Sequence, residues 1–236
     1  MMEVPVQDGK RFEAITFDCY GTLVDWESGI LAALGPVLRA HRIEAQDDAL
    51  LARYAELESA AEAGAYHSYR EVLRAVVAGF GAALGFEPTR QELACLETSL
   101  PHWRPFPDTV AALSILAKRF RLGVISNVDD DLFSHTAKAL GVHFDLVVTA
   151  QQVGAYKPAV RLFHCALRAL ALPAARVLHA AQSLYHDVVP AQSLGMSTVW
   201  VQRRRAASGF GATPPATATP DLVVPDLQSL VNLLRL

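Results

Sequence analysis

The feature that most constrains the fold of this 236-residue sequence is a strand-like segment separated from the rest of its sheet by a long helical stretch. The segment 12–17 is short, apolar and rich in β-branched and aromatic residues, which predicts a buried strand. From Ser28 to about Thr98 no strand pattern occurs, and strong helix formers dominate. Ser68 with Glu71, and Thr89 with Glu92, match the capping-box pattern of helix starts. This stretch therefore predicts an insert of about four helices.

After Pro101 the pattern changes to strands that alternate with helices of about ten residues. Such alternation implies right-handed crossovers and a parallel sheet covered on both faces. We therefore predict an α/β fold, with a Rossmann-like parallel sheet as core and an inserted helical cap domain. The core comprises residues 1–25 and 103–236, and the cap comprises residues 26–102. The predicted strands after the cap are 122–126, 144–149, 177–181, 198–201 and 222–224; the predicted helices are 109–119, 132–140, 160–171, 187–194 and one that Asp226 caps.

Composition excludes several classes of protein. Hydrophobic residues make up 52% of the chain and charged residues 19%, which is typical of a folded globular protein. The net charge of −3 favours neither a nucleic acid nor an anionic membrane as partner, and we interpret the basic run 203–205 as a solvated loop or strand end. Three widely spaced cysteines suggest neither a disulfide framework nor a zinc site. With no signal-peptide pattern and no apolar run of bilayer length, we expect a cytoplasmic protein.

Polar residues follow several of the predicted strands. Asp18, Ser126, the segment before Lys157, and Gln182 all come just after a strand. Ligands of open α/β sheets bind at the carboxyl ends of the strands, so these residues mark a candidate active site. A carboxylate at the position of Asp18 can act as a nucleophile, although a single Asp at a strand end is more often a cap or turn residue.

Four segments resemble the motifs of the haloacid-dehalogenase superfamily, in the expected order. Phe-Asp-Cys-Tyr-Gly-Thr-Leu-Val-Asp at 17–25 resembles the first motif, and Val-Ile-Ser-Asn at 124–127 resembles the second. Tyr-Lys-Pro at 156–158 is similar to the third, and 182–187 to the fourth. The predicted helical insert lies where that superfamily carries its cap. The Asp-x-Tyr-Gly-Thr-Leu form most resembles the L-2-haloacid dehalogenases.

The resemblance implies a two-step hydrolysis of a small 2-haloacid. Asp18 is the expected nucleophile; it forms an ester with the substrate carbon while halide departs, and water then hydrolyses the ester. The expected catalytic residues are Asp18, Thr22, Lys157 and Asp187. The expected substrate-binding residues are Tyr20, Arg53, Ser126 and Asn127, with Arg53 and Asn127 holding the halide and Ser126 holding the carboxylate.

Two positions bear on the choice between halide and phosphate as leaving group. Phosphatases of the superfamily carry a second Asp two residues after the nucleophile, where this chain has Tyr20; a halide needs no proton from such an acid. The first acidic position of the fourth motif is Gln182 here, which weakens a Mg²⁺ site. We therefore expect no cofactor and no metal, although Mg²⁺ would be needed by the phosphatase alternative.

The chain also departs from the dehalogenase pattern. Phe163, Gln182 and Leu184 stand where that family has Tyr, Ser and Asn, so a non-catalytic member that binds a small acid or a protein stays an alternative. Lysines occur only at positions 10, 118, 138 and 157, so the predicted cap lacks the Schiff-base lysine of phosphonoacetaldehyde hydrolase. We expect a small-molecule substrate, and homodimerisation is left open.

Overall fold

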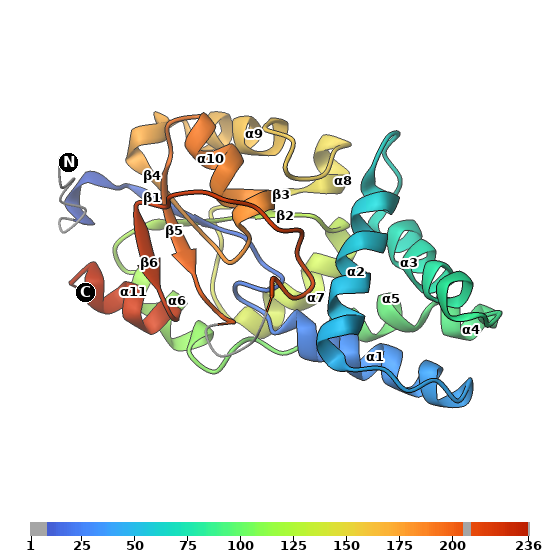
Figure 1. The fold of residues 1–236 in the computed structure, drawn as a ribbon. Helices are drawn as coiled ribbons and strands as arrows, with labels where there is room; N and C mark the ends of the chain where they lie inside the picture. Colours follow the sequence, from blue (N-terminus) through green and yellow to red (C-terminus); the bar gives the residue numbers. More distant parts are fainter. Residues whose placement is uncertain (1–8, 205–208, 236) are drawn as a thin grey trace.

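A six-stranded parallel sheet forms the centre of the protein, as the computed structural model in Figure 1 shows. The structure describes residues 9–204 and 209–235. The strand order is β3-β2-β1-β4-β5-β6, so β1 lies in the middle although it comes first in the sequence. The predicted α/β fold with a parallel sheet is confirmed. The strands are β1 (Ala14–Phe17), β2 (Arg121–Ser126), β3 (Leu146–Thr149), β4 (Val177–Ala181), β5 (Ser197–Val201) and β6 (Leu222–Val224).

Helices cover both faces of this sheet (Figure 1). One face packs against α9, and Ile125 of β2 meets Phe163 and Leu170 of that helix in one apolar cluster. The other face packs against α6, α7 and α11, where Val124 of β2 lies in a second, larger cluster. Successive strand residues thus point to opposite faces and are buried on both, which explains the continuous apolar runs of the sequence. The α-helices outside the insert are α6 (Thr109–Leu116), α7 (Asp130–Leu140), α8 (Ala150–Val153), α9 (Arg161–Leu170), α10 (Val189–Ser193) and α11 (Leu227–Leu233).

The insert between β1 and β2 consists of helices that lie together at one end of the sheet (Figure 1). They are α1 (Trp26–Ala40), α2 (Asp47–Glu62), α3 (Tyr69–Leu84), α4 (Arg90–Leu93) and α5 (Cys95–Ser99). Five helices replace the expected four because Ala94, with ψ near 0°, interrupts the last one. Both predicted capping boxes are present, at the starts of α3 and α4. We propose residues 26–102 as the cap, as the sequence predicts.

Polar contacts connect this insert to the core. The carboxylate of Asp129, before α7, accepts the backbone N–H groups of Tyr69 and Arg70 at 2.9 and 3.1 Å. Asp129 thus satisfies free N–H groups at the start of α3. Arg203 and Arg204 are not solvated, because Arg203 pairs with Asp108 and Arg204 pairs with Glu27 and Asp48 in α1 and α2. Arg205, the last residue of the basic run, lies outside the described residues.

No helix in the described part of the chain is both long and apolar enough to cross a bilayer.

Candidate active site

The carboxyl ends of three neighbouring strands converge on one pocket. Asp18 follows β1, Asn127 follows β2 and Gln182 follows β4, and β1 pairs with both of the other strands. Side chains of α1, α2 and α3, which belong to the insert, also line the pocket. The lining residues are Asp18, Tyr20, Trp26, Glu58, Glu62, Tyr69, Ser126, Asn127, Lys157, Gln182, Ser183, His186, Asp187 and Thr213.

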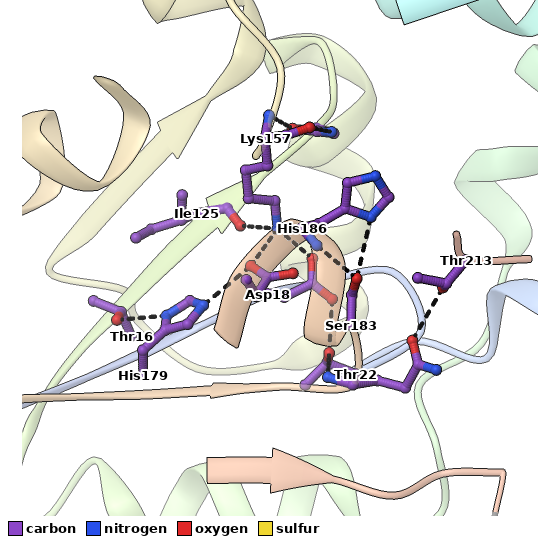
Figure 2. Close-up of polar contacts among 12 residues, drawn as sticks. Thr16, Asp18, Thr22, Ile125, Lys157, His179, Ser183, His186 and Thr213 are labelled. Atoms are coloured by element: carbon purple, nitrogen blue, oxygen red, sulfur yellow. Dashed lines mark hydrogen bonds and ion pairs between the residues drawn. The ribbon is translucent and has the colours of Figure 1, made fainter. Parts of the chain in front are cut away.

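Asp18 is held by the turn that follows it. The hydroxyl of Thr22 donates to Oδ2 of Asp18 at 2.6 Å and accepts the backbone N–H of Gln182 at 2.9 Å, so it links the ends of β1 and β4 (Figure 2). Gly21 makes this turn possible: its φ is +92°, and a Cβ there would lie 2.8 Å from Nε1 of Trp26. A residue with a side chain would be strained in this conformation. The Gly-Thr pair thus fixes the carboxylate at the pocket floor.

Lys157 lies between two carboxylates. Its Nζ donates to Oδ1 of Asp18 at 2.8 Å, to Oδ1 of Asp187 at 2.7 Å and to the carbonyl of Ile125 at 3.0 Å (Figure 2). The side chain of Asn127 fixes the lysine backbone, because it accepts the Lys157 N–H at 2.7 Å and donates to the Lys157 carbonyl at 3.2 Å. The ammonium group is therefore fixed in direction as well as buried.

Asp187 lies on a π-helical turn, Leu184–Val188, directly after β4. Its Oδ1 also lies 3.0 Å from Nε2 of His179, whose Nδ1 lies 2.9 Å from Oγ1 of Thr16 (Figure 2). Since an ionised carboxylate only accepts hydrogen bonds, Nε2 of His179 donates to Asp187. Oδ2 of Asp187 is buried and has no hydrogen-bond partner in the described chain, so it is free for a ligand or water.

Burial and charge set the protonation of this cluster. Burial raises the pKa of Asp18, and the attraction of Lys157 only partly offsets it. Burial also acts to raise the pKa of Asp187, but Lys157 and His179 outweigh it, so the pKa of Asp187 is lowered. The same two carboxylates outweigh the burial of Lys157 and raise its pKa. Lys157 and Asp187 are therefore charged at neutral pH, and Asp18 is the more basic of the two carboxylates.

Two predicted substrate-binding residues line the pocket in different ways. Oγ of Ser126 is buried and lacks a hydrogen-bond partner among the described residues, so it is available to a ligand. The Tyr20 hydroxyl is 2.9 Å from Oγ1 of Thr136, and its ring lies edge-on to Trp103. Burial raises the pKa of Tyr20 well above its ordinary value, so this phenol keeps its proton. Tyr20 is thus a wall of the pocket.

Arg53 does not line this pocket, so the structure does not bring this predicted halide ligand together with the other site residues. It pairs with Glu56 at 2.8 Å on the surface of α2, and about half of its side chain (52%) is exposed. The buried face of α2 carries Tyr54 and Glu58, and Arg53 is rotated by about 100° from Tyr54 around the helix axis. The resemblance in sequence thus identified the helix that lines the pocket, but Arg53 lies on its exposed face rather than on the face toward the pocket.

Several residues that line or support the pocket were not predicted from the sequence as parts of the site. Glu58 and Glu62 follow Tyr54 at helical spacing, and this acidic i, i+4 pair on an otherwise apolar face was the available signal. His179 gave no signal, because it lies inside a strand. His186 also lines the pocket; burial lowers its pKa to about 4, so it is neutral at pH 7.

The residues present do not fit a Mg²⁺ ion. Such a site needs several hard oxygen ligands. Lys157 already lies between Asp18 and Asp187, and the side-chain carbonyl of Gln182 accepts from Thr213 at 3.3 Å. Within residues 9–204 and 209–235, no group of three or more His, Cys, Asp or Glu side chains is arranged to hold a metal.

Comparison with known proteins places the chain in a family. Residues 12–195 match the model of the haloacid dehalogenase-like hydrolases. An (S)-2-haloacid dehalogenase of Pseudomonas putida is 30% identical over 219 residues, covering 86% of this chain and 91% of that protein. A glyceraldehyde 3-phosphate phosphatase of Methanothermobacter thermautotrophicus is 38% identical over 101 residues, covering 42% of this chain and 45% of that protein. A crystal structure of an L-2-haloacid dehalogenase superposes with a TM-score of 0.77 and 25% identity, covering 95% of this chain and 99% of that one. The matched motifs and the fold agree, and this chain is a hydrolase that belongs to the haloacid dehalogenase-like family.

Proposed function

We propose that this hydrolase is a dehalogenase that displaces halide from a small molecule, such as a 2-haloacid, whose halogen-bearing carbon lies next to a carbonyl group. The observation that carries the proposal is the setting of Asp18. Its carboxylate is held by Thr22 and Lys157 at the floor of the pocket, and Tyr20 stands where a phosphatase needs an acid. A halide leaves as a stable anion without such an acid.

In the first step, a lone pair of the Asp18 carboxylate attacks the carbon from the side opposite the halogen. A carbon–oxygen bond forms, the carbon–halogen bond breaks, and the halide leaves with the bonding electrons. Lys157 orients Asp18 while Thr22 fixes its other oxygen, which holds the nucleophile for in-line attack. The step inverts the configuration at the carbon.

In the second step, water attacks the carbonyl carbon of the Asp18 ester. Oδ2 of Asp187 is the candidate base, because it is buried and has no hydrogen-bond partner among the described residues while Lys157 and His179 hold Oδ1. The water oxygen stays on Asp18, and the alcohol product takes one water proton while the other is released. No step needs a metal, and we propose that the reaction is metal-independent.

The relatives support this assignment over a phosphatase. The haloacid dehalogenase match covers 86% of this chain, whereas the phosphatase match covers 42%. Gln182 and Tyr20 also differ from the acidic residues that phosphate transfer requires.

Halide release from L-2-chloropropionate in the presence of EDTA tests the proposal, with Asp18→Asn as control. Halide release by the wild type that is lost in D18N supports metal-free displacement by Asp18. Release of phosphate from small phosphate esters with Mg²⁺, without halide release, would replace the proposal with the phosphatase alternative. The absence of both activities would favour the non-catalytic alternative.

A further inference from the structure

Gln182 stands beside the nucleophile on a backbone that is fixed from two sides. It directly follows β4 and lines the same pocket as Asp18. Its backbone N–H donates to the hydroxyl oxygen of Thr22 at 2.9 Å, and its carbonyl accepts from Nε1 of Trp200 at 2.9 Å. Neither bond involves the Gln182 side chain. The position of this residue in the site therefore does not depend on which side chain it carries.

The side-chain amide of Gln182 is oriented by Thr213. The Thr213 hydroxyl donates to Oε1 of Gln182 at 3.3 Å. The preceding residue, Ala212, is anchored in turn, because its N–H donates to Oε1 of Glu27 in α1 at 3.1 Å. Nε2 of Gln182 makes no hydrogen bond with any described residue. The amide thus turns its acceptor toward Thr213 and keeps its two N–H donors for a ligand.

Ser126 and Gln182 lie on either side of the nucleophile, at the same level of the sheet. Phe17 of β1 pairs with Val124 of β2 and with Ala180 of β4. Ser126 and Gln182 each come two residues after those partners, so their side chains leave the sheet on the same side. Because β2 and β4 flank β1, the two backbones are about 10 Å apart. A small group that meets both side chains therefore lies over the end of β1.

Both side chains are neutral donors in a pocket with little positive charge. Oγ of Ser126 is buried and has no hydrogen-bond partner in the described chain. Among the described residues that line the pocket, Lys157 is the one cation at neutral pH, and it already contacts Asp18 and Asp187. An anionic substrate group needs hydrogen bonds from neutral donors here, since a buried charge without them is costly. An acidic side chain in place of Gln182 would repel such a group.

We propose that Gln182 binds the carboxylate of the 2-haloacid, with Nε2 donating to one carboxylate oxygen while the hydroxyl of Ser126 donates to the other. This inference rests on the proposed dehalogenation by Asp18, and it leaves the bonds made and broken at Asp18 unchanged. The dehalogenase resemblance has a serine at the position of Gln182. The longer amide reaches further from β4 toward the substrate, so this departure from the motif supplies a determinant of specificity for a carboxylate over a neutral group of the same size.

Chloroacetate and chloroacetamide test this selectivity, because they match in size and differ in charge. Halide release is measured at pH 8 with EDTA for the wild type, Q182E and Q182M, and D18N supplies the background from alkylated cysteines. Q182E keeps an oxygen that accepts from Thr213 and replaces the N–H₂ donor with a second acceptor, whereas Q182M removes the donor without adding charge.

The measured quantity is the ratio of kcat/KM for chloroacetate to kcat/KM for chloroacetamide. We expect Q182E to lower this ratio by about tenfold or more, chiefly through KM for chloroacetate, because one hydrogen bond to a charged group is lost. We expect Q182M to lower the ratio by about threefold or more. Gln91→Glu, at an exposed position of α4, makes the same change of charge away from the pocket and leaves the ratio unchanged.

Glycolate and glycolamide, the products of the two hydrolyses, separate this inference from the proposed function because they bind without reaction. Tighter calorimetric binding of glycolate than of glycolamide by the wild type, lost in Q182E and Q182M, supports the inference even if the wild type releases no halide. In that case only the proposed dehalogenation fails. Halide release with an unchanged ratio in either variant overturns the inference and leaves dehalogenation standing. The absence of both halide release and a preference for glycolate overturns both.

Discussion

Nε2 of His179 lies 3.0 Å from Oδ1 of Asp187, and the ring of Phe163 stands edge-on to this histidine with 5.2 Å between ring centroids. Phe163 occupies the position where the dehalogenase resemblance has a tyrosine. The neighbouring strand β4 thus supplies a polar contact for Asp187 that Phe163 cannot make. This relationship explains how the site keeps Asp187 oriented despite the departure at Phe163.

His179→Phe is therefore expected to slow ester hydrolysis rather than substrate binding. His179 does not line the pocket, and its loss leaves Oδ1 of Asp187 held by Lys157 alone. Because a misplaced base lowers the rate strongly, we expect kcat to fall by up to about a hundredfold with KM nearly unchanged. Intact-mass spectrometry should detect accumulated ester on Asp18. His164→Phe, at an exposed position of α9, is the control; equal kcat in both variants would contradict a positioning role.

Lys157→Met is expected to destabilise the fold as well as abolish turnover. The change leaves Asp18 and Asp187 buried without their shared cation, which typically costs about 3–5 kcal/mol. Without Lys157, the pKa of Asp18 rises further and the pKa of Asp187 loses the attraction that lowers it, so protonation relieves part of this loss as the pH falls. Urea unfolding at pH 8 and pH 5 measures both effects. Lys138→Met, exposed on α7, should shift stability by less than about 0.5 kcal/mol, and a similar loss in both variants would refute the argument.

The parts of the site that depend on strand ends can be predicted from the sequence. Asp18 follows β1, Ser126 ends β2 and Asn127 follows it, and parallel pairing brings such strand ends together whatever the packing of the helices. The helical insert was predicted from its composition, but the orientation of each of its helices depends on tertiary packing. For that reason α2 was identified while its pocket-facing residues, Glu58 and Glu62, were not. His179 was missed because a buried strand residue shows no pattern until its neighbours are known.

Arg53→Ala should leave the activity unchanged. The side chain is half exposed and, among the described residues, pairs with Glu56 alone, an i, i+3 contact on the surface of α2. Such exposed pairs contribute less than about 1 kcal/mol to stability, and the guanidinium does not reach the pocket. We expect halide release within about twofold of the wild type, because loss of this exposed pair removes no group that lines the pocket. A large loss of kcat in R53A would show that α2 turns its other face to the substrate during turnover.

Glu58→Gln should change how stability depends on pH. The pKa of Glu58 is raised from 4.5 to about 7, first by burial, with Asp18 also raising it and the hydroxyls of Tyr54 and Tyr69 opposing both. The folded state therefore binds the Glu58 proton more tightly than the unfolded state does. This contribution to stability is fully present below the unfolded pKa near 4.5 and is lost as the pH rises through about 7.

The glutamine variant removes that titration but keeps an oxygen that can accept from both phenols. The free energy of unfolding of E58Q minus that of the wild type should therefore be larger at pH 8 than at pH 4.5. We expect this increase to be up to about 3 kcal/mol. Urea unfolding at several pH values between 4.5 and 8 measures the difference, with Glu56→Gln as the exposed control on the same helix. If the E58Q and wild-type stability curves run parallel across this range, Glu58 has an ordinary pKa and its carboxyl is already ionised in the folded protein.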